Sequence, residues 1–129
     1  MNPRLIGTML VALAVAPTSH ANSEAERRGT VAGLRTDCQA AITYVDKGFK
    51  EADSKGLMSF GFCIGYIWAF LENPPTGVCV PTGVDAEQGA RVFLKWADEN
   101  PDQHHISRPM GLWIALRQAF QCGENQGSD

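Results

Sequence analysis

Hydrophobic residues recur at intervals of three and four over most of the chain, which is the spacing of one face of an α-helix. The first such stretch has its apolar positions at Leu34, Cys38, Ala41, Ile42, Val45 and Phe49. The polar run 51–56 that follows it ends in a glycine and reads as a connection. We therefore expect a first helix over 34–49.

The second stretch, 57–72, is the most hydrophobic part of the chain after the N-terminal segment. One stripe consists of Phe60, Ile64, Ile67 and Leu71, and further apolar residues lie around the circumference at Cys63, Trp68 and Phe70. This distribution predicts a central helix, with Ser59 as a candidate N-cap. Gly61 and Gly65 are four residues apart, a spacing that predicts close approach of another backbone.

A breaker at 73–77, with sequence NPPTG, ends this helix and predicts a rigid projecting loop. A third helix should follow Asp85, because Asp85 and Gln88 form the pattern of a capping box. Pro101 stops that helix, and a fourth should begin near Ser107 and end at Cys122. No segment shows a sustained two-residue alternation. The fold class expected is all-α, a bundle of about four helices arranged as two hairpins.

The N-terminal segment has the features of a secretory signal peptide. An apolar run of about a dozen residues follows Arg4, is too short to span a bilayer, and leads to small residues at Ser19 and Ala21. We expect a signal peptide over 1–21 and an exported, periplasmic product. The other expected parts are a flexible segment 22–33, a single domain 34–122 and a disordered tail 123–129.

The net charge of the mature chain restricts the classes of macromolecule that we expect it to bind. Without Arg4, ten of the 11 Lys and Arg residues remain against 14 Asp and Glu, so the mature chain has a net charge of −4. Nucleic acids and anionic membranes bind clustered positive charge, so neither is expected as a partner. A basic protein partner fits this balance.

Four cysteines in an exported chain predict disulfides. Three pairings are open to Cys38, Cys63, Cys79 and Cys122. In the two-hairpin arrangement the ends of the third and fourth helices are neighbours, which favours Cys79–Cys122 and leaves Cys38–Cys63 to join the first two helices. A Cys38–Cys122 bond would contradict this arrangement.

The polar residues do not form a recognisable catalytic or metal-binding motif. There is no C-x-x-C pair, and the adjacent His104 and His105 point in different directions in a regular backbone. The carboxylates Asp98, Glu99 and Asp102 cluster around one turn, where a solvated helix end is the simplest interpretation. The tryptophans at 68, 96 and 113 fall within helical patterns and are most simply core residues, although one could anchor an interface. We expect no enzyme, no metal and no cofactor.

Four short motifs, in order, resemble the Rap/Tai immunity proteins of type VI secretion. They are FCIGYI at 62–67, CVPTGV at 79–84, NPDQHH at 100–105 and AFQC at 119–122. The resemblance spans about 34–122. The chain departs from the family pattern at Ala69, where a second glycine is common, and at Gln121, where proline is common.

The resemblance implies a periplasmic, all-helical, homodimeric protein that binds and neutralises a peptidoglycan amidase effector by occluding its active site. Two segments are our candidates for effector contact, the rigid proline loop and the acidic turn. Their residues are Pro74, Pro75, Asp98, Glu99, Asp102, Gln103 and His104. The alternative function is that of a periplasmic acid-stress chaperone-like helical protein, which shares export, helices and disulfides.

Overall fold

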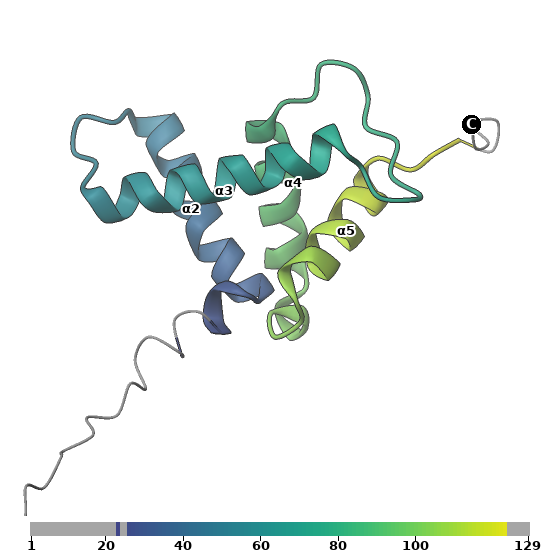
Figure 1. Ribbon diagram of the computed structural model, residues 1–129, viewed down its shortest axis with the longest axis horizontal. Coiled ribbons are helices and arrows are strands. Elements are labelled where there is room, and N and C mark those ends of the chain that lie inside the picture. The colour runs from purple at the N-terminus through teal and green to yellow at the C-terminus, as the bar shows by residue number, and fades with distance from the viewer. Residues whose placement is uncertain (1–22, 24–25, 124–129) are drawn as a thin grey trace, which may run out of the picture.

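The computed structural model describes residue 23 and residues 26–123. Its helices are α2 (Val31–Lys47), α3 (Ser54–Glu72), α4 (Ala86–Glu99) and α5 (Arg108–Ala119), with a short 3-10 helix η1 (Pro101–Gln103) between the last two (Figure 1). Over the described residues, β-structure is limited to two isolated bridges. The prediction of an all-α fold is confirmed. The expected signal peptide, 1–21, and the tail from 124 onward lie outside the described residues.

The N-terminal boundary of the packed region lies earlier than the sequence pattern suggests. Thr30 caps α2, its hydroxyl accepting a hydrogen bond from the backbone N–H of Gly33, and both Val31 and Gly33 are buried. Residues 31–33 of the segment expected to be flexible therefore belong to the first core helix. At the other end α2 stops at Lys47 and Gly48 has a φ of 87°, so Phe49 lies beyond the helix that was expected to include it.

The start of α3 corrects the expected cap. Asp53 is the N-cap, because its Oδ1 accepts a hydrogen bond of 2.8 Å from the N–H of Gly56. Ser59 lies within the helix, and its hydroxyl donates to Asp37 Oδ1 on α2 at 2.7 Å. The hydroxyl is therefore used in a contact between two helices, which no local pattern reveals.

The capping box of α4 is present as predicted. Asp85 Oδ1 accepts from the N–H of Gln88 at 2.8 Å, and Gln88 Oε1 accepts from the N–H of Asp85 at 3.3 Å. Ser107 stands at the N-cap position of α5, but its side chain makes no capping hydrogen bond. Because α5 ends at Ala119, Cys122 lies three residues beyond the helix that was expected to end there.

The helices surround one core. α3 contacts α2 and α4 and runs across them, while α4 also contacts α2 and α5 (Figure 1). The largest fully buried side chains are Phe93, Leu34, Ile67, Leu112, Leu116 and Val31. α3 approaches α4 closely at Gly89, where an added Cβ would lie 2.6 Å from Ile67 Cγ2, and it approaches α2 closely at Gly56, where an added Cβ would clash with the Tyr44 ring. The prediction that Gly61 and Gly65 mediate such an approach is wrong within the described chain, since added Cβ atoms there would meet nothing within 4 Å.

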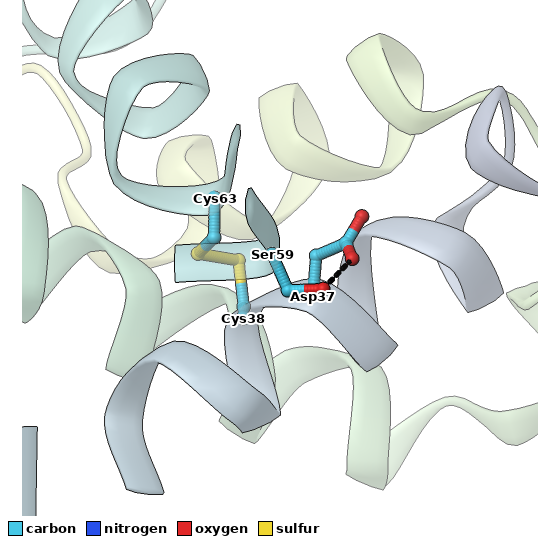
Figure 2. Close-up of a disulfide and its surroundings, with 4 residues drawn as sticks. All are labelled: Asp37, Cys38, Ser59 and Cys63. Atoms are coloured by element: carbon cyan, nitrogen blue, oxygen red, sulfur yellow. Dashed lines mark hydrogen bonds between the residues drawn. A yellow bond between two sulfur atoms is a disulfide. The ribbon is translucent and has the colours of Figure 1, made fainter. Parts of the chain in front are cut away.

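Both expected disulfides are present. Cys38–Cys63 joins α2 to α3 with a Cα–Cα distance of 4.9 Å, and both cysteines are fully buried (Figure 2). Cys79–Cys122 joins the segment before α4 to the segment after α5 with a Cα–Cα distance of 5.0 Å. The predicted pairing is confirmed, because the termini of the α4–α5 pair are neighbours as the hairpin arrangement requires.

Candidate partner-binding surface

The proline loop, residues 73–77, projects at the end of α3 (Figure 1). Pro74 is exposed and Pro75 is half-buried. The N–H of Val78 donates to the carbonyl of Pro75 at 3.1 Å, and Gly77 has a φ of 86°, a conformation that side-chain-bearing residues rarely adopt. Two fixed proline φ angles and a closed turn leave this loop little conformational freedom.

Residues of α5 and the chain after it hold the loop from one side. The indole Nε1 of Trp113 donates to the carbonyl of Thr76 at 3.1 Å, and the guanidinium of Arg117 lies 5.1 Å from the centre of the Trp113 ring. Immediately after the loop, the N–H of Cys79 donates to the carbonyl of Phe120 at 2.9 Å, next to the Cys79–Cys122 bond. The loop is therefore anchored at its base, and its proline tip is presented to solvent.

Two hollows border the loop. The first is an open, mainly apolar groove of about 550 Å³, lined by Phe70, Pro75, Thr76, Ser107, Pro109, Met110 and Trp113. The second is a more polar hollow of about 560 Å³, lined by Gly77, Trp113, Ile114, Arg117, Gln118, Gln121 and Cys122. Trp113 lines both of them. A partner that covers this surface would meet an anchored loop bordered by two depressions.

An aromatic row on α3 leads into the apolar groove. Phe62, Tyr66 and Phe70 are in successive ring contact, with centroid distances of 5.9 Å and 5.3 Å. The guanidinium of Arg108 lies 4.9 Å from the centre of the Phe62 ring and 4.7 Å from that of Tyr66. Burial raises the pKa of the Tyr66 hydroxyl, and the hydrogen bond and positive charge of Arg108 oppose that rise. The ring contacts hold Phe70 in place beside the groove. The same row holds the positively charged guanidinium of Arg108 at the start of α5.

The polar groups of the acidic turn, residues 98–104, make hydrogen bonds to other parts of the chain and to one another. Asp98 Oδ1 accepts from Arg35 Nε at 2.7 Å, and Gln103 Nε2 donates to Asp102 Oδ2 at 2.9 Å. His104 Nε2 lies 2.7 Å from the carbonyl of Ala97 and helps to terminate α4. The carbonyl of His104 accepts from the N–H of Ala32, so the turn also fixes the start of α2.

The two candidate segments are not brought together. Figure 1 shows the proline loop near the C-terminal end of α5 and η1 at its N-terminal end. Within the described part of the chain, no hydrogen bond or ion pair joins them. Asp98, Glu99 and Asp102 are exposed, but Asp98, Asp102 and His104 each have a hydrogen-bond partner within the described chain.

Sequence reasoning missed the groove beside the loop. Met110 is 49% exposed although it is an apolar residue within the predicted fourth helix, and Trp113 is only half-buried. Of the three tryptophans, Trp96 is in the core as expected, while Trp68 is 52% exposed. The apolar pattern marks these residues as helical, but it carries no signal for which of them another helix will cover.

All four cysteines are in disulfides, so none has a thiol that could act as a nucleophile or metal ligand. Over residues 26–123 and residue 23, no group of three or more His, Cys, Asp or Glu side chains is placed to hold a metal ion.

Comparison with known proteins gives one match. The family model described as Rap1a immunity proteins matches residues 30–122. No curated protein and no solved structure matches the chain.

Proposed function

Since the chain belongs to the Rap1a immunity proteins, a family of inhibitors that bind effector proteins, we propose that it neutralises a peptidoglycan amidase effector of type VI secretion in the periplasm. The inhibitor acts by binding and blocking the effector's active site and performs no chemistry itself. The observation that supports this proposal best is the anchored proline loop between its two hollows.

Occlusion of an active-site groove requires an element that protrudes and loses little entropy on binding. The proline loop has both properties, because Pro74 is exposed and the Thr76 carbonyl is fixed by Trp113. In this proposal the loop enters the effector's groove, and the apolar groove lined by Met110 and Trp113 receives a side chain of the effector. Nanomolar affinity corresponds to about −12 kcal/mol, and a few desolvated anchors of this kind supply most of such a binding energy.

The acidic turn has a secondary part in the proposal. Glu99 and Asp102 are exposed and can attract a basic effector surface, an effect that acts mainly on the association rate. Asp98, Gln103 and His104 would contact the effector only with groups that their internal hydrogen bonds leave available. We therefore propose that the residues that contribute most binding energy lie at the proline loop and its groove, and that the acidic turn supplies long-range electrostatic attraction.

The disulfides and the family indicate an exported protein. The periplasm is the compartment we propose, because two disulfides form and persist there and peptidoglycan is the substrate of the proposed effector. The signal peptide that the sequence predicts over 1–21 would direct this export.

Periplasmic co-expression tests the proposal. The full-length chain should protect cells against a peptidoglycan amidase effector encoded next to it, and the same chain without residues 1–21 should not. Absence of protection by the exported chain against any adjacent amidase would overturn the function.

Calorimetric titration of the effector with the purified chain tests the surface. Met110→Glu and the double variant Pro74→Ala, Pro75→Ala should each weaken binding at least about tenfold, because each removes an anchor or its rigidity. Gln39→Glu on α2 is the matched control, since Gln39 is exposed and lines neither hollow. Unchanged affinity in Met110→Glu and in the proline variant would remove the anchors from this surface.

A further inference from the structure

The two disulfides differ in their access to solvent. Cys38 and Cys63 are 0% exposed between α2 and α3, whereas Cys79 and Cys122 are only half-buried. Reduction by a thiol requires a thiolate to reach one of the two sulfur atoms, so burial protects a disulfide and exposure makes it reactive. A reductant can therefore open Cys79–Cys122 while the fold still protects Cys38–Cys63.

The polar hollow beside the proline loop leads to the exposed bond. Cys122 forms part of its wall, and the hollow has a volume of about 560 Å³. It opens to solvent and has room for a small thiol reductant. Neither Cys38 nor Cys63 lines this hollow or the apolar groove. The path to a sulfur atom thus exists on one disulfide and not on the other.

The charge in the polar hollow favours attack by a thiolate. Arg117 lines the hollow beside Cys122, and no acidic side chain lines it. The Arg117 guanidinium lies 5.1 Å from the centre of the Trp113 ring and forms no ion pair with any other described residue. A nearby positive charge stabilises both an approaching thiolate and the thiolate that leaves when the bond between the sulfur atoms breaks.

The exposed bond also closes the base of the proline loop. Cys79 lies just after the loop, and its N–H donates to the carbonyl of Phe120 at 2.9 Å. Cys122 lies beyond the end of α5, and no further helix follows it among the described residues. Opening the bond therefore frees the base of the loop and the segment after α5, while the buried disulfide continues to join α2 to α3.

We propose that Cys79–Cys122 is a thiol–disulfide exchange site for a small dithiol reductant, and that its opening releases the proline loop. One thiolate of the reductant attacks Sγ of Cys122, the bond between the two sulfur atoms breaks, and Cys79 leaves as a thiolate that takes a proton from water. The second thiol of the reductant loses its proton and displaces Cys122 from the mixed disulfide, and the Cys122 sulfur is then protonated. The reductant loses two electrons and becomes a disulfide, and the Cys79–Cys122 pair gains them. Only the effect of this step on effector affinity rests on the proposed function.

Partial reduction of the wild-type chain with dithiothreitol tests the site. Samples are trapped with iodoacetamide under native conditions, and peptide mapping measures the initial rate at which each cysteine is modified. Cys79 and Cys122 should react at least about tenfold faster than Cys38 and Cys63. In concentrated urea the rates should become similar, because the folded structure causes the difference. Equal rates in the native chain, or earlier opening of Cys38–Cys63, would overturn the proposal.

Charge-altering variants test the contribution of Arg117. Arg117→Gln should slow the opening of Cys79–Cys122 about threefold or more, whereas Arg117→Lys should keep most of the wild-type rate because it keeps the charge. High salt should reduce the difference between these two variants. Lys47→Gln is the matched control, since Lys47 is an exposed cation on α2 that does not line the hollow. Opening that is as fast in Arg117→Gln as in the wild type would overturn the electrostatic role.

Amide hydrogen exchange tests the release of the loop without an effector. After selective opening and alkylation, the N–H groups of Val78 and Cys79, which donate to the carbonyls of Pro75 and Phe120, should exchange at least about tenfold faster. The helical circular dichroism should be retained. Cys79→Ser with Cys122→Ser, which carries no alkyl group, should give the same result. Unchanged exchange at both N–H groups, or loss of the helical signal, would overturn a local release.

Calorimetric titration of the effector separates this proposal from the proposed function. The selectively opened chain should bind at least about tenfold more weakly than the oxidised chain, because the loop has lost its fixed geometry. Equal affinities of the two forms would overturn control of binding by this disulfide. If the oxidised chain binds no amidase effector, the proposed function fails, while the trapping and hydrogen-exchange results still decide whether the exchange site exists.

Discussion

Asp37 is the buried ionisable side chain of the described core, 3% exposed beside the Cys38–Cys63 disulfide (Figure 2). Its Oδ1 accepts the Ser59 hydroxyl at 2.7 Å, while its Oδ2 has no hydrogen-bond partner among the described residues. Ser59→Ala removes the donor and leaves the carboxyl group unsatisfied, so the free energy of unfolding should fall by about 1–3 kcal/mol. Urea unfolding at neutral pH measures this loss.

Thr43→Ala is the control for this residue-scale prediction. The Thr43 hydroxyl is exposed and donates only to the Gln39 carbonyl of its own helix, so its removal should change stability by less than about 0.5 kcal/mol. In an Asp37→Ala background the cost of Ser59→Ala should also disappear, because the two side chains then no longer interact. If Ser59→Ala still lowered the free energy of unfolding by about 1–3 kcal/mol in that background, the loss could not be attributed to the hydrogen bond between Ser59 and Asp37.

The environments of single residues were the least predictable from sequence. Trp68 and Trp96 both fall within helical apolar patterns, yet Trp96 is 5% exposed and Trp68 is 52% exposed. The pattern determines that each lies on a helix, whereas burial depends on which neighbouring helix reaches it. Asp37 shows the same limit, since its burial follows from the crossing of α3 over α2 and not from its neighbours in sequence.

At the scale of elements, the N-cap residues of α4 and α5 allow a direct comparison of helix capping. Asp85 makes both bonds of a capping box, while Ser107 stands at an equivalent position without a side-chain capping bond. Asp85→Ala should therefore lower the free energy of unfolding by about 1 kcal/mol. Ser107→Ala should cost less than about 0.5 kcal/mol. Chemical denaturation compares the two variants, and equal losses would contradict the structural difference.

Helix ends that are set by residues adjacent in sequence were predicted well. The capping box of α4 and the break at 73–77 depend on residues adjacent in sequence, and both are present. The start of α3 was misplaced because Ser59 and Asp53 are both acceptable caps by residue type. Only the backbone path selects Asp53, whose Oδ1 reaches the N–H of Gly56.

At the scale of the whole molecule, the disulfides supply a large part of the stability. In the chain-entropy description, sequence separations of 25 and 43 residues correspond to about 3.5 and 4 kcal/mol. Their sum is comparable to the total stability of a small domain, roughly 5–15 kcal/mol. Reduction should therefore bring the chain close to unfolding at 25 °C.

Urea denaturation with and without dithiothreitol tests this expectation. The midpoint of the reduced chain should fall sharply, and Cys79→Ala with Cys122→Ala should lose about 4 kcal/mol without reductant. An unchanged midpoint in dithiothreitol would show that helix packing alone holds the fold.

The pairing of the cysteines was predictable and the surface proposed to bind the partner largely was not. The disulfides follow from the topology, because the segments before α4 and after α5 must meet in a helical pair. The break at the proline loop was correctly predicted, but the grooves beside it depend on how α5 packs against the loop. Only the Trp113–Thr76 hydrogen bond and the residues lining the two hollows reveal that surface.

The different settings of the three tryptophans have a practical consequence. Trp96 is in the core, Trp113 is bonded to the proline loop and Trp68 stands on the outer face of α3. Indole fluorescence depends on solvent contact, so versions of the chain that retain one tryptophan each would carry a separate optical reporter. Trp96 would then follow unfolding, Trp113 the engagement of the loop and Trp68 changes at the exposed face of α3, without an added label.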